Sequence, residues 1–344
     1  MGARAAGKGV RRAPVMRGAR RGACRGVRQA GVAIISVLLV ITLATLIVSG
    51  LFWREHVTVR SVENRLALAQ VRWIETAVLD WASVVLRVDQ ASTGAVDHLA
   101  ELWATPVAET VLDETVTGGA RLADSANDAR LAGQIFDAQA RLNLNNLVLD
   151  GLPSGAHREV FERLLAILGR PESLAARLQA RLQQAYPPLV DGRRAPASAL
   201  PLLKLADLRT VPGFDEATIA LLEPYVAFLP KRVRTGTVEI ATENTRINVN
   251  TAPAEVLAAA IGSIDLQAAR RFVEGARQRT FFASLDVARS RFDGTPALPA
   301  NLLSVGSDFF FVKGMIRFDR VESHSEALLY RGPNRVELIW QHRY

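Results

Sequence analysis

The chain has 344 residues, of which 49% are hydrophobic and 22% are charged. This length and composition allow two modest domains with apolar cores, and they exclude an intrinsically disordered chain. Residues 1–31 hold nine Arg and Lys and no Asp or Glu, so the net charge of +8 leaves −1 for residues 32–344. A near-neutral body lacks the positive charge that supplies most nonspecific nucleic-acid affinity, and a single cysteine, Cys24, excludes an internal disulfide.

An uncharged stretch follows the basic leader and runs from Gln29 to Trp53. Its strongly apolar part, residues 32–52, would form a helix of about 32 Å, which is enough to cross a hydrocarbon core of about 30 Å. The stretch is longer than the apolar core of a usual signal peptide, and no A-x-A-like cleavage site closes it. Because nine basic residues precede it, we expect a cytoplasmic N-terminus and a body across the membrane.

The next segment, residues 54–88, keeps a helical repeat of apolar residues with the charged residues off the repeat. The repeat comprises Val62, Leu66, Ala69, Trp73 or Ile74, Ala77 and Trp81. No proline occurs between Val15 and Pro106, so nothing interrupts a helix between the membrane segment and this amphipathic one. We therefore predict one helix of roughly 50 residues or more, whose second half packs through this repeat on a soluble domain.

The sequence RQAGVAIISVLLV around Gly31 resembles a type IV prepilin processing site, in which a basic leader ends in glycine before an apolar helix. The resemblance implies that prepilin peptidase cleaves between Gly31 and Val32 and that Val32 becomes an N-methylated first residue. Most pilins and pseudopilins carry glutamate at the fifth mature position, where this chain has Ser36. The missing glutamate and the large size are similar to the minor pseudopilin K family of type II secretion systems. A plain single-pass anchor with an incidental glycine is the alternative.

Beyond residue 105, extended and helical patterns follow one another. Residues 106–147 favour strands around a Gly-Gly turn, a block rich in alanine and leucine follows, and three runs with strand alternation close the chain. The resemblance implies an α+β fold, in which a long N-terminal helix packs on an antiparallel sheet and an all-α insertion interrupts the domain. The expected organisation is a leader at 1–31, a transmembrane helix at 32–53, pseudopilin segments at 54–150 and 301–344, and the insertion at 151–300.

Two sequences in the helical block, TVPGFDEATIALLEPYV and AAAIGSIDLQAARRFVEGAR, resemble helix-hairpin-helix units. Such hairpins can bind DNA phosphates through backbone amides, which gives a membrane-anchored DNA receptor of a competence or pilus system as an alternative function. Pro212, which has no N–H, and the acidic residues after each hairpin argue against phosphate binding, as does the body charge of −1. A basic group is expected to form a solvated helix face, and it consists of Arg270, Arg271, Arg277 and Arg279.

Metal and catalytic motifs are sparse in the sequence. The five histidines show no H-E-x-x-H spacing, no G-x-S-x-G occurs, and no Gly-rich phosphate loop follows a strand, so an enzyme is the least favoured class. The densest group of oxygen ligands on an expected loop is Asp124, Asn127 and Asp128, whose spacing differs from an EF-hand. The resemblance to the K family implies that calcium could bind in the soluble region, with no ligand set assigned.

The sequence therefore predicts a non-enzymatic minor pseudopilin at the tip of the secretion pseudopilus. The resemblance implies as partners the minor pseudopilins I and J, also pseudopilin H, the major pseudopilin G and prepilin peptidase, and no nucleic acid. It also implies a protein of the bacterial inner membrane that crosses it once, with its body in the periplasm. In such a filament the glutamate is thought to pair with the N-terminal amine of a neighbour, so a chain with Ser36 is suited to the top of the stack.

Overall fold

The computed structural model describes residues 27–112, 129–190, 193–242, 244–318 and 321–344. These residues belong to two units, Met1–Asn64 and Arg65–Tyr344, each of which is considered by itself. The Gly-Gly turn and the oxygen-rich segment at Asp124, Asn127 and Asp128 lie outside the described residues.

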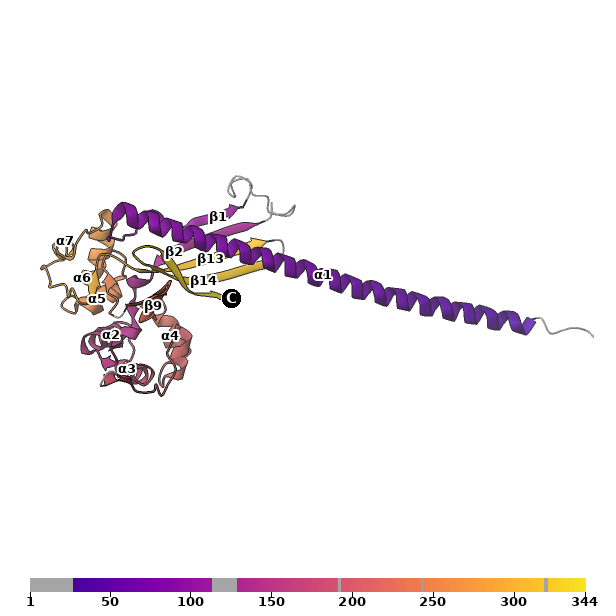
Figure 1. Cartoon of the computed structure of the whole chain (residues 1–344), viewed down its shortest axis with the longest axis horizontal. Helices are drawn as coiled ribbons and strands as arrows, with labels where there is room; N and C mark the ends of the chain where they lie inside the picture. The colour runs from indigo at the N-terminus through magenta and orange to yellow at the C-terminus, as the bar shows by residue number, and fades with distance from the viewer. Residues whose placement is uncertain (1–26, 113–128, 191–192, 243, 319–320) are drawn as a thin grey trace, which may run out of the picture. The chain divides into compact units, whose positions relative to one another are not determined.

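Helix α1 (Val27–Thr93) is one continuous helix of 67 residues, as the absence of proline predicts (Figure 1). It ends at Gly94, which has φ +77° and donates its N–H to the Gln90 carbonyl at 3.1 Å. Within the first unit, the apolar residues from Val32 to Trp53 are all exposed, and this part of α1 is long and apolar enough to span a membrane.

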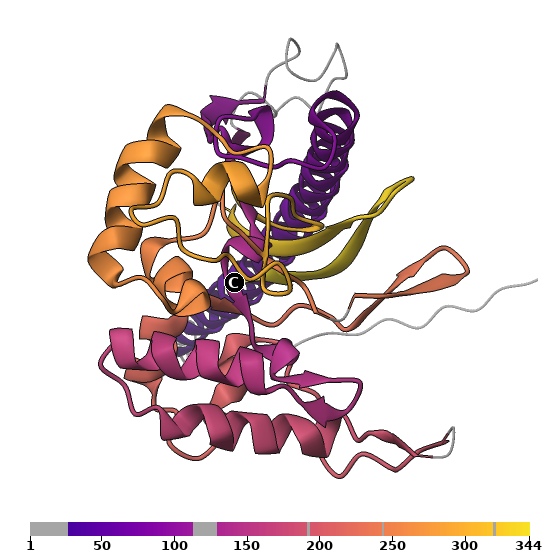
Figure 2. The same ribbon diagram turned by 90° about the vertical axis from the view of Figure 1, so that its left-hand side faces the viewer.

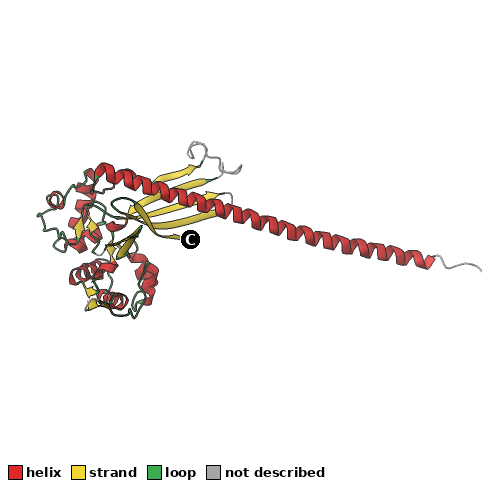
Figure 3. Ribbon diagram, viewed as in Figure 1, coloured by secondary structure: helices red, strands yellow, loops and turns green. Residues whose placement is uncertain are grey.

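The second unit contains a five-stranded antiparallel sheet with the strand order β1-β2-β13-β14-β15 (Figure 3). The strands are β1 (Val107–Val111), β2 (Arg130–Asp137), β13 (Phe309–Phe318), β14 (Val321–Arg331) and β15 (Val336–Arg343). The three C-terminal strands confirm the alternation read from the sequence, and β2 joins them across the helical block by pairing with β13. Residues 67–86 of α1 cover the sheet through two apolar clusters.

The helical block has a core of its own, with members from Leu142 to Leu303. Its α-helices are α2 (Gly155–Ile167), α3 (Ser173–Ala185), α4 (Glu216–Leu222), α5 (Ala254–Ile261), α6 (Leu266–Arg271) and α7 (Leu285–Arg289). A π-helix, η6 (Phe272–Arg277), continues α6. Figure 2 shows α2 and α3 side by side, below the orange part of the chain that holds α5 and α6. The predicted α+β class is confirmed. The limits of the all-α insertion, at residues 151 and 300, stay predictions.

Short elements complete the described part of this unit. The 3₁₀ turns are η1 (Leu102–Ala104), η3 (Ala138–Ala140), η4 (Leu144–Leu147) and η5 (Leu205–Thr210). The short strand pairs are β3 (Leu142–Asn143) with β8 (Val226–Ala227), β4 (Val148–Leu149) with β5 (Leu152–Pro153), β6 (Leu189–Val190) with β7 (Arg193–Arg194), β9 (Arg232–Thr235) with β10 (Val238–Ala241), and β11 (Ile247–Asn248) with β12 (Leu303–Ser304).

The face of α1 that packs on the sheet differs from the predicted one. The buried residues are Ala67, Val71, Ile74, Ala82, Val85 and Leu86. Apart from Ile74, the predicted repeat from Leu66 onward is exposed, so the prediction that it packs on the body was wrong. The physical reason is Glu75, which interrupts the buried face with a charge and is itself buried. Its carboxylate accepts a hydrogen bond from Ser323 at 2.8 Å and pairs with Arg343, so the sheet neutralises it.

Candidate functional site

The expected processing site lies in the first turns of α1. Gly31 and Val32 are both helical, and the Val32 side chain is exposed. The Ser36 hydroxyl donates a hydrogen bond to the Ala33 carbonyl at 2.9 Å, within its own helix. A neutral hydroxyl that is already bonded to its own backbone cannot replace a carboxylate as the partner of an amine.

A second apolar face runs along α1 within residues 65–93, beside the face that packs on the sheet. We name it the outer stripe, and it consists of Leu66, Trp73, Ala77, Trp81, Val84 and Val88. Their spacings of seven, four, four, three and four residues keep all six on one side of the helix. The exposed fraction is 75% at Trp73 and 50% at Trp81, so the described residues of the chain leave most of the first ring and half of the second in solvent.

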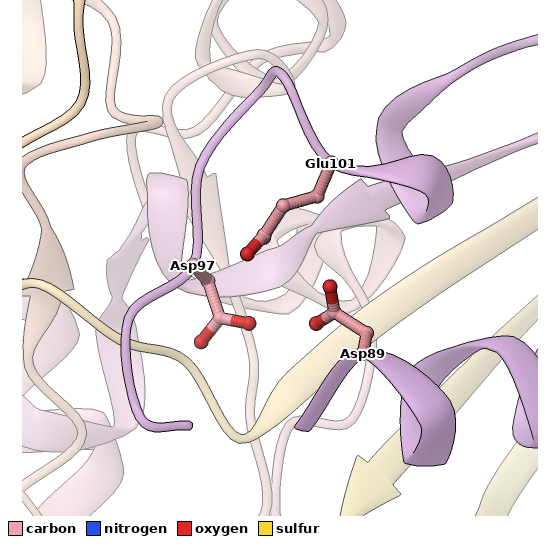
Figure 4. A group of neighbouring side chains, drawn as sticks. All are labelled: Asp89, Asp97 and Glu101. Atoms are coloured by element: carbon pink, nitrogen blue, oxygen red, sulfur yellow. The ribbon is translucent and has the colours of Figure 1, made fainter. Parts of the chain in front are cut away.

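Four buried charged residues form a cluster where α1 ends, and Figure 4 shows the three carboxylates among them. We name it the acid–arginine cluster, and it consists of Asp89 on α1, Asp97 and Glu101 on the following loop, and Arg331 on β14. Arg331 donates from Nη1 to Asp89 Oδ2 at 3.0 Å and from Nη2 to Asp97 Oδ2 at 2.6 Å. Two carboxylates therefore share one guanidinium while Glu101 accepts from the His98 N–H and Trp103 Nε1, so full ionisation would leave an excess of negative charge.

The electrostatics of the cluster follow from this imbalance. Burial raises the pKa of Asp89 to about 6, and the Glu101 carboxylate adds to the rise while Arg331 opposes it. Burial likewise raises the pKa of Asp97 to about 7, against the lowering effect of Arg331. Among the described residues, Asp97 Oδ1 and Glu101 Oε1 are buried without a hydrogen-bond partner. One oxygen from each carboxylate lies within 4.8 Å of the others, an arrangement that suits a hard cation.

The acid–arginine cluster connects α1, the sheet and the helical block. Ser307 donates its N–H to Asp97 Oδ2 and its hydroxyl to Asp137 Oδ2, both at 2.7 Å. Asn248, on β11 of the helical block, donates to the Asp97 carbonyl at 3.1 Å and to Asp137 Oδ2 at 3.0 Å. Sequence patterns do not reveal this network, because Asp89, Asp97 and Glu101 precede Arg331 by more than 200 residues, as the separation of 242 between Asp89 and Arg331 shows.

The two hairpins are present, and in both of them a carboxylate of the chain binds the N-terminus of the helix that follows the turn. Gly213 and Gly262 have φ values of +100° and +70° and form the turns. The carboxylate of Asp215 accepts from the Thr218 N–H at 2.8 Å, and that of Asp265 accepts from the Ala268 N–H at 2.7 Å. Each helix N-terminus that would face a phosphate therefore holds a carboxylate of the chain, which would repel it.

The basic group after the second hairpin is only partly a solvated face. Arg270, Arg271 and Arg279 are exposed, as expected. Arg277 is partly buried, burial lowers its pKa to about 10, and it donates to the Ala252 carbonyl, so the prediction was wrong for this residue. The reason is the π-helix η6, whose wider turn changes which residues face outward relative to an uninterrupted α-helix.

The histidines occupy unrelated positions. His157 is buried beside Ser154, with Nδ1 at 2.8 Å from the hydroxyl oxygen, and burial lowers its pKa to about 4. His98 stacks on Phe281 with ring centroids 3.9 Å apart. Within the described ranges, no histidine belongs to a group of side chains that could share a metal ion. The group found there consists of Asp89, Asp97 and Glu101.

Comparisons with known proteins agree with this architecture. A family model described as Type II secretion system (T2SS), protein K matches residues 247–306, and a second model of the same description matches residues 140–231. The type II secretion system protein K of Pseudomonas aeruginosa is 33% identical over 286 residues, which cover 75% of each chain. That of Klebsiella pneumoniae is 28% identical over 344 residues, covering 92% of this chain and 97% of the relative.

A solved structure shares the fold. The GspK-GspI-GspJ complex from the type 2 secretion system of enterotoxigenic Escherichia coli contains a chain that matches with a TM-score of 0.61 and 19% identity. The match covers 83% of this chain and 99% of that one. A long helix on an antiparallel sheet, joined to a helical block, defines a pilin-like α+β protein. On the sequence matches, the chain belongs to the type II secretion system protein K family, whose members are minor pseudopilins and structural components of the secretion apparatus.

Proposed function

We propose that the chain is the tip component of the type II secretion pseudopilus. In this role it assembles with the minor pseudopilins I and J, starts the pseudopilus, and so supports export of folded proteins from the periplasm. The observation that carries the proposal is the outer stripe of α1, which the described part of its own domain leaves uncovered. The E. coli structure, a complex of GspK, GspI and GspJ, supports the choice of partners.

The outer stripe has the chemistry of a helix-packing surface. Trp73 and Trp81 are eight residues apart on one side of α1, with Ala77 between them. Small and large residues in alternation form the ridges and grooves by which two helices pack, and exposed tryptophans are the residues that most often dominate interfaces. An aromatic side chain buries about 150–250 Å² when it is covered, so two tryptophans left in water favour a partner helix.

The position at the tip rests on Ser36 and on the helical block. The Ser36 hydroxyl is bonded within its own helix and offers no charge to the amine of a neighbour above it. A pseudopilus that contains pseudopilin H and the major pseudopilin G would then grow below this chain.

The long apolar part of α1 supports a single crossing of the inner membrane, with the basic leader in the cytoplasm and the body in the periplasm. The proposed role is structural and requires no catalysis.

Processing between Gly31 and Val32 is a further part of the proposal. When the chain is produced with its prepilin peptidase, we expect a mature N-terminus at Val32 with one added methyl group, measured by mass spectrometry. Gly31→Leu should leave the leader attached, because a bulky side chain at the cleavage position obstructs the peptidase. Ser36→Glu should be cleaved like the wild type. A mature N-terminus at any other residue would contradict the prepilin assignment.

Assembly is tested by co-purifying the full chain with the minor pseudopilins I and J of the same bacterium in detergent. The double substitution Trp73→Gln with Trp81→Gln should weaken the complex by about tenfold or more, because each truncated interface tryptophan costs about 2 kcal/mol. The matched control is Leu152→Gln with Leu200→Gln, which removes two exposed leucines of the helical block and should leave the complex intact. Complex yields in the tryptophan variant equal to those of the wild type would refute the proposed surface.

We also propose that the acid–arginine cluster holds calcium in the assembled protein. Its three carboxylates are buried, and Asp97 Oδ1 accepts no hydrogen bond, so they are the donor set that Ca²⁺ prefers. Asp89, Asp97 and Glu101 would supply the ligands, and the bound cation would offset the negative charge that Arg331 leaves uncompensated. The remaining function of these residues is to fix the loop after α1 against the sheet.

Thermal unfolding of the purified full chain tests this site. Millimolar CaCl₂ should raise the melting temperature by several degrees over EDTA, since a ligand at about 100 times its Kd adds about 2.7 kcal/mol to the folded state. The increment should disappear in Glu101→Gln and Asp89→Asn and persist in Glu239→Gln, which alters an exposed glutamate. The calcium proposal is wrong if the increment is absent in the wild type or equal in all four proteins.

A further inference from the structure

A cavity of about 490 Å³ lies between the π-helix η6 and the segment that follows α7. We name it the arginine pocket after the three arginines that line it, Arg271, Arg279 and Arg291. It belongs entirely to the helical block and shares no lining residue with the acid–arginine cluster or the outer stripe. Neither the pilin-like sheet nor the membrane helix therefore accounts for it.

The pocket carries unbalanced positive charge. Arg271 pairs with Asp293, whose Oδ2 lies 3.1 Å from its Nε. Among the residues that the structure describes, the guanidinium groups of Arg279 and Arg291 make no hydrogen bond or ion pair, and both residues are exposed at the pocket. The neighbouring arginines do have partners, since Arg270 pairs with Glu255 at 3.2 Å and Arg277 donates a hydrogen bond to the Ala252 carbonyl. Two free guanidinium groups at one cavity favour an anionic ligand.

The wall behind the arginines is aromatic and rigid. Phe272 and Phe292 stack with ring centroids 3.8 Å apart and an interplanar angle of 7°, and both line the pocket. Phe272 also stacks on the fully buried Phe282 at 5.1 Å, which anchors the wall to the core of the block. Because Phe272 and Phe292 are only 2% and 4% exposed, they fix the backbone behind the pocket and leave the arginines as the groups that can meet a ligand.

We propose that the arginine pocket is a docking site for an acidic peptide segment of another protein. One or two Asp or Glu side chains of that segment pair with Arg279 and Arg291. Guanidinium and carboxylate groups match in a planar, two-bond geometry, which gives such a contact direction as well as charge. The proposal goes beyond the tip role, because it assigns the helical block an acidic protein segment that does not pack on α1.

A nucleic acid fits the pocket less well. Asp293 stands at its rim, and the hairpin that precedes it presents Asp265 at the helix N-terminus. A phosphate chain needs a continuous basic track, whereas residues 32–344 carry a net charge of −1. A short acidic segment needs only the local charge of the pocket.

Fluorescence polarisation with the purified full chain tests the proposal. The probe is a dye-labelled peptide that alternates Glu and Phe, its control is the same peptide with Gln in place of Glu, and a single-stranded 12-mer oligonucleotide is the third ligand. The wild type should bind the Glu peptide at least about tenfold more tightly than the Gln peptide, because the charge-assisted bonds are lost with the carboxylates. Binding should weaken with added salt, as expected for exposed charges.

Variants locate the interaction. Arg279→Gln with Arg291→Gln should reduce affinity for the Glu peptide by about tenfold or more, whereas Arg87→Gln, which removes an exposed arginine of α1, should leave it unchanged. The proposal is overturned if the double variant binds like the wild type, if Glu and Gln peptides bind equally, or if the oligonucleotide binds more tightly than the Glu peptide. Because the assay omits the minor pseudopilins I and J, its failure would leave the assembly proposal standing.

Discussion

The soluble part of α1 carries two apolar faces, and the sheet of the chain covers one of them. Ala82, Val85 and Leu86 pack on β2, β13 and β14, while Trp73 and Trp81 remain in solvent. The contact of two tryptophans and their apolar neighbours with water is unfavourable in free energy, and association with another helix would remove it. The proposed function of the chain depends on this unsatisfied face more than on any single polar residue.

Buried charges hold in place the face of α1 that packs on the sheet. Glu75 binds Ser323 on β14 and Arg343 on the edge strand β15, and the acid–arginine cluster ties the end of α1 to Arg331. Such pairs contribute little net stability, because desolvation offsets their attraction, but each is strongly unfavourable if one partner moves away. They therefore fix the rotation of α1 on the sheet, and that rotation decides that the outer stripe faces solvent.

Much of the fold could be read from the sequence, since it depends on local pattern. The absence of proline between Val15 and Pro106 predicts the length of α1, and the alternation in DFFFVKGMIRFD predicts a C-terminal strand that β13 confirms. The face of α1 could not be predicted, because two apolar repeats coexist and the buried one contains Glu75. The acid–arginine cluster depends on contacts such as that of Asp89 with Arg331, and no periodicity encodes them. The π-helix η6 likewise leaves no local signature, although it shapes the arginine pocket.

Photo-crosslinking in the native membrane tests the account most directly. A benzoylphenylalanine at Ala77, in the outer stripe, should crosslink to the long helix of minor pseudopilin I or J, and one at Arg72, exposed on α1 away from the stripe, should not. The adduct would be identified by mass spectrometry of the crosslinked peptides. Crosslinks from position 72 but not 77, or none from position 77 in cells that assemble the secretion system, would contradict the claim that this face of α1 joins the pseudopilins.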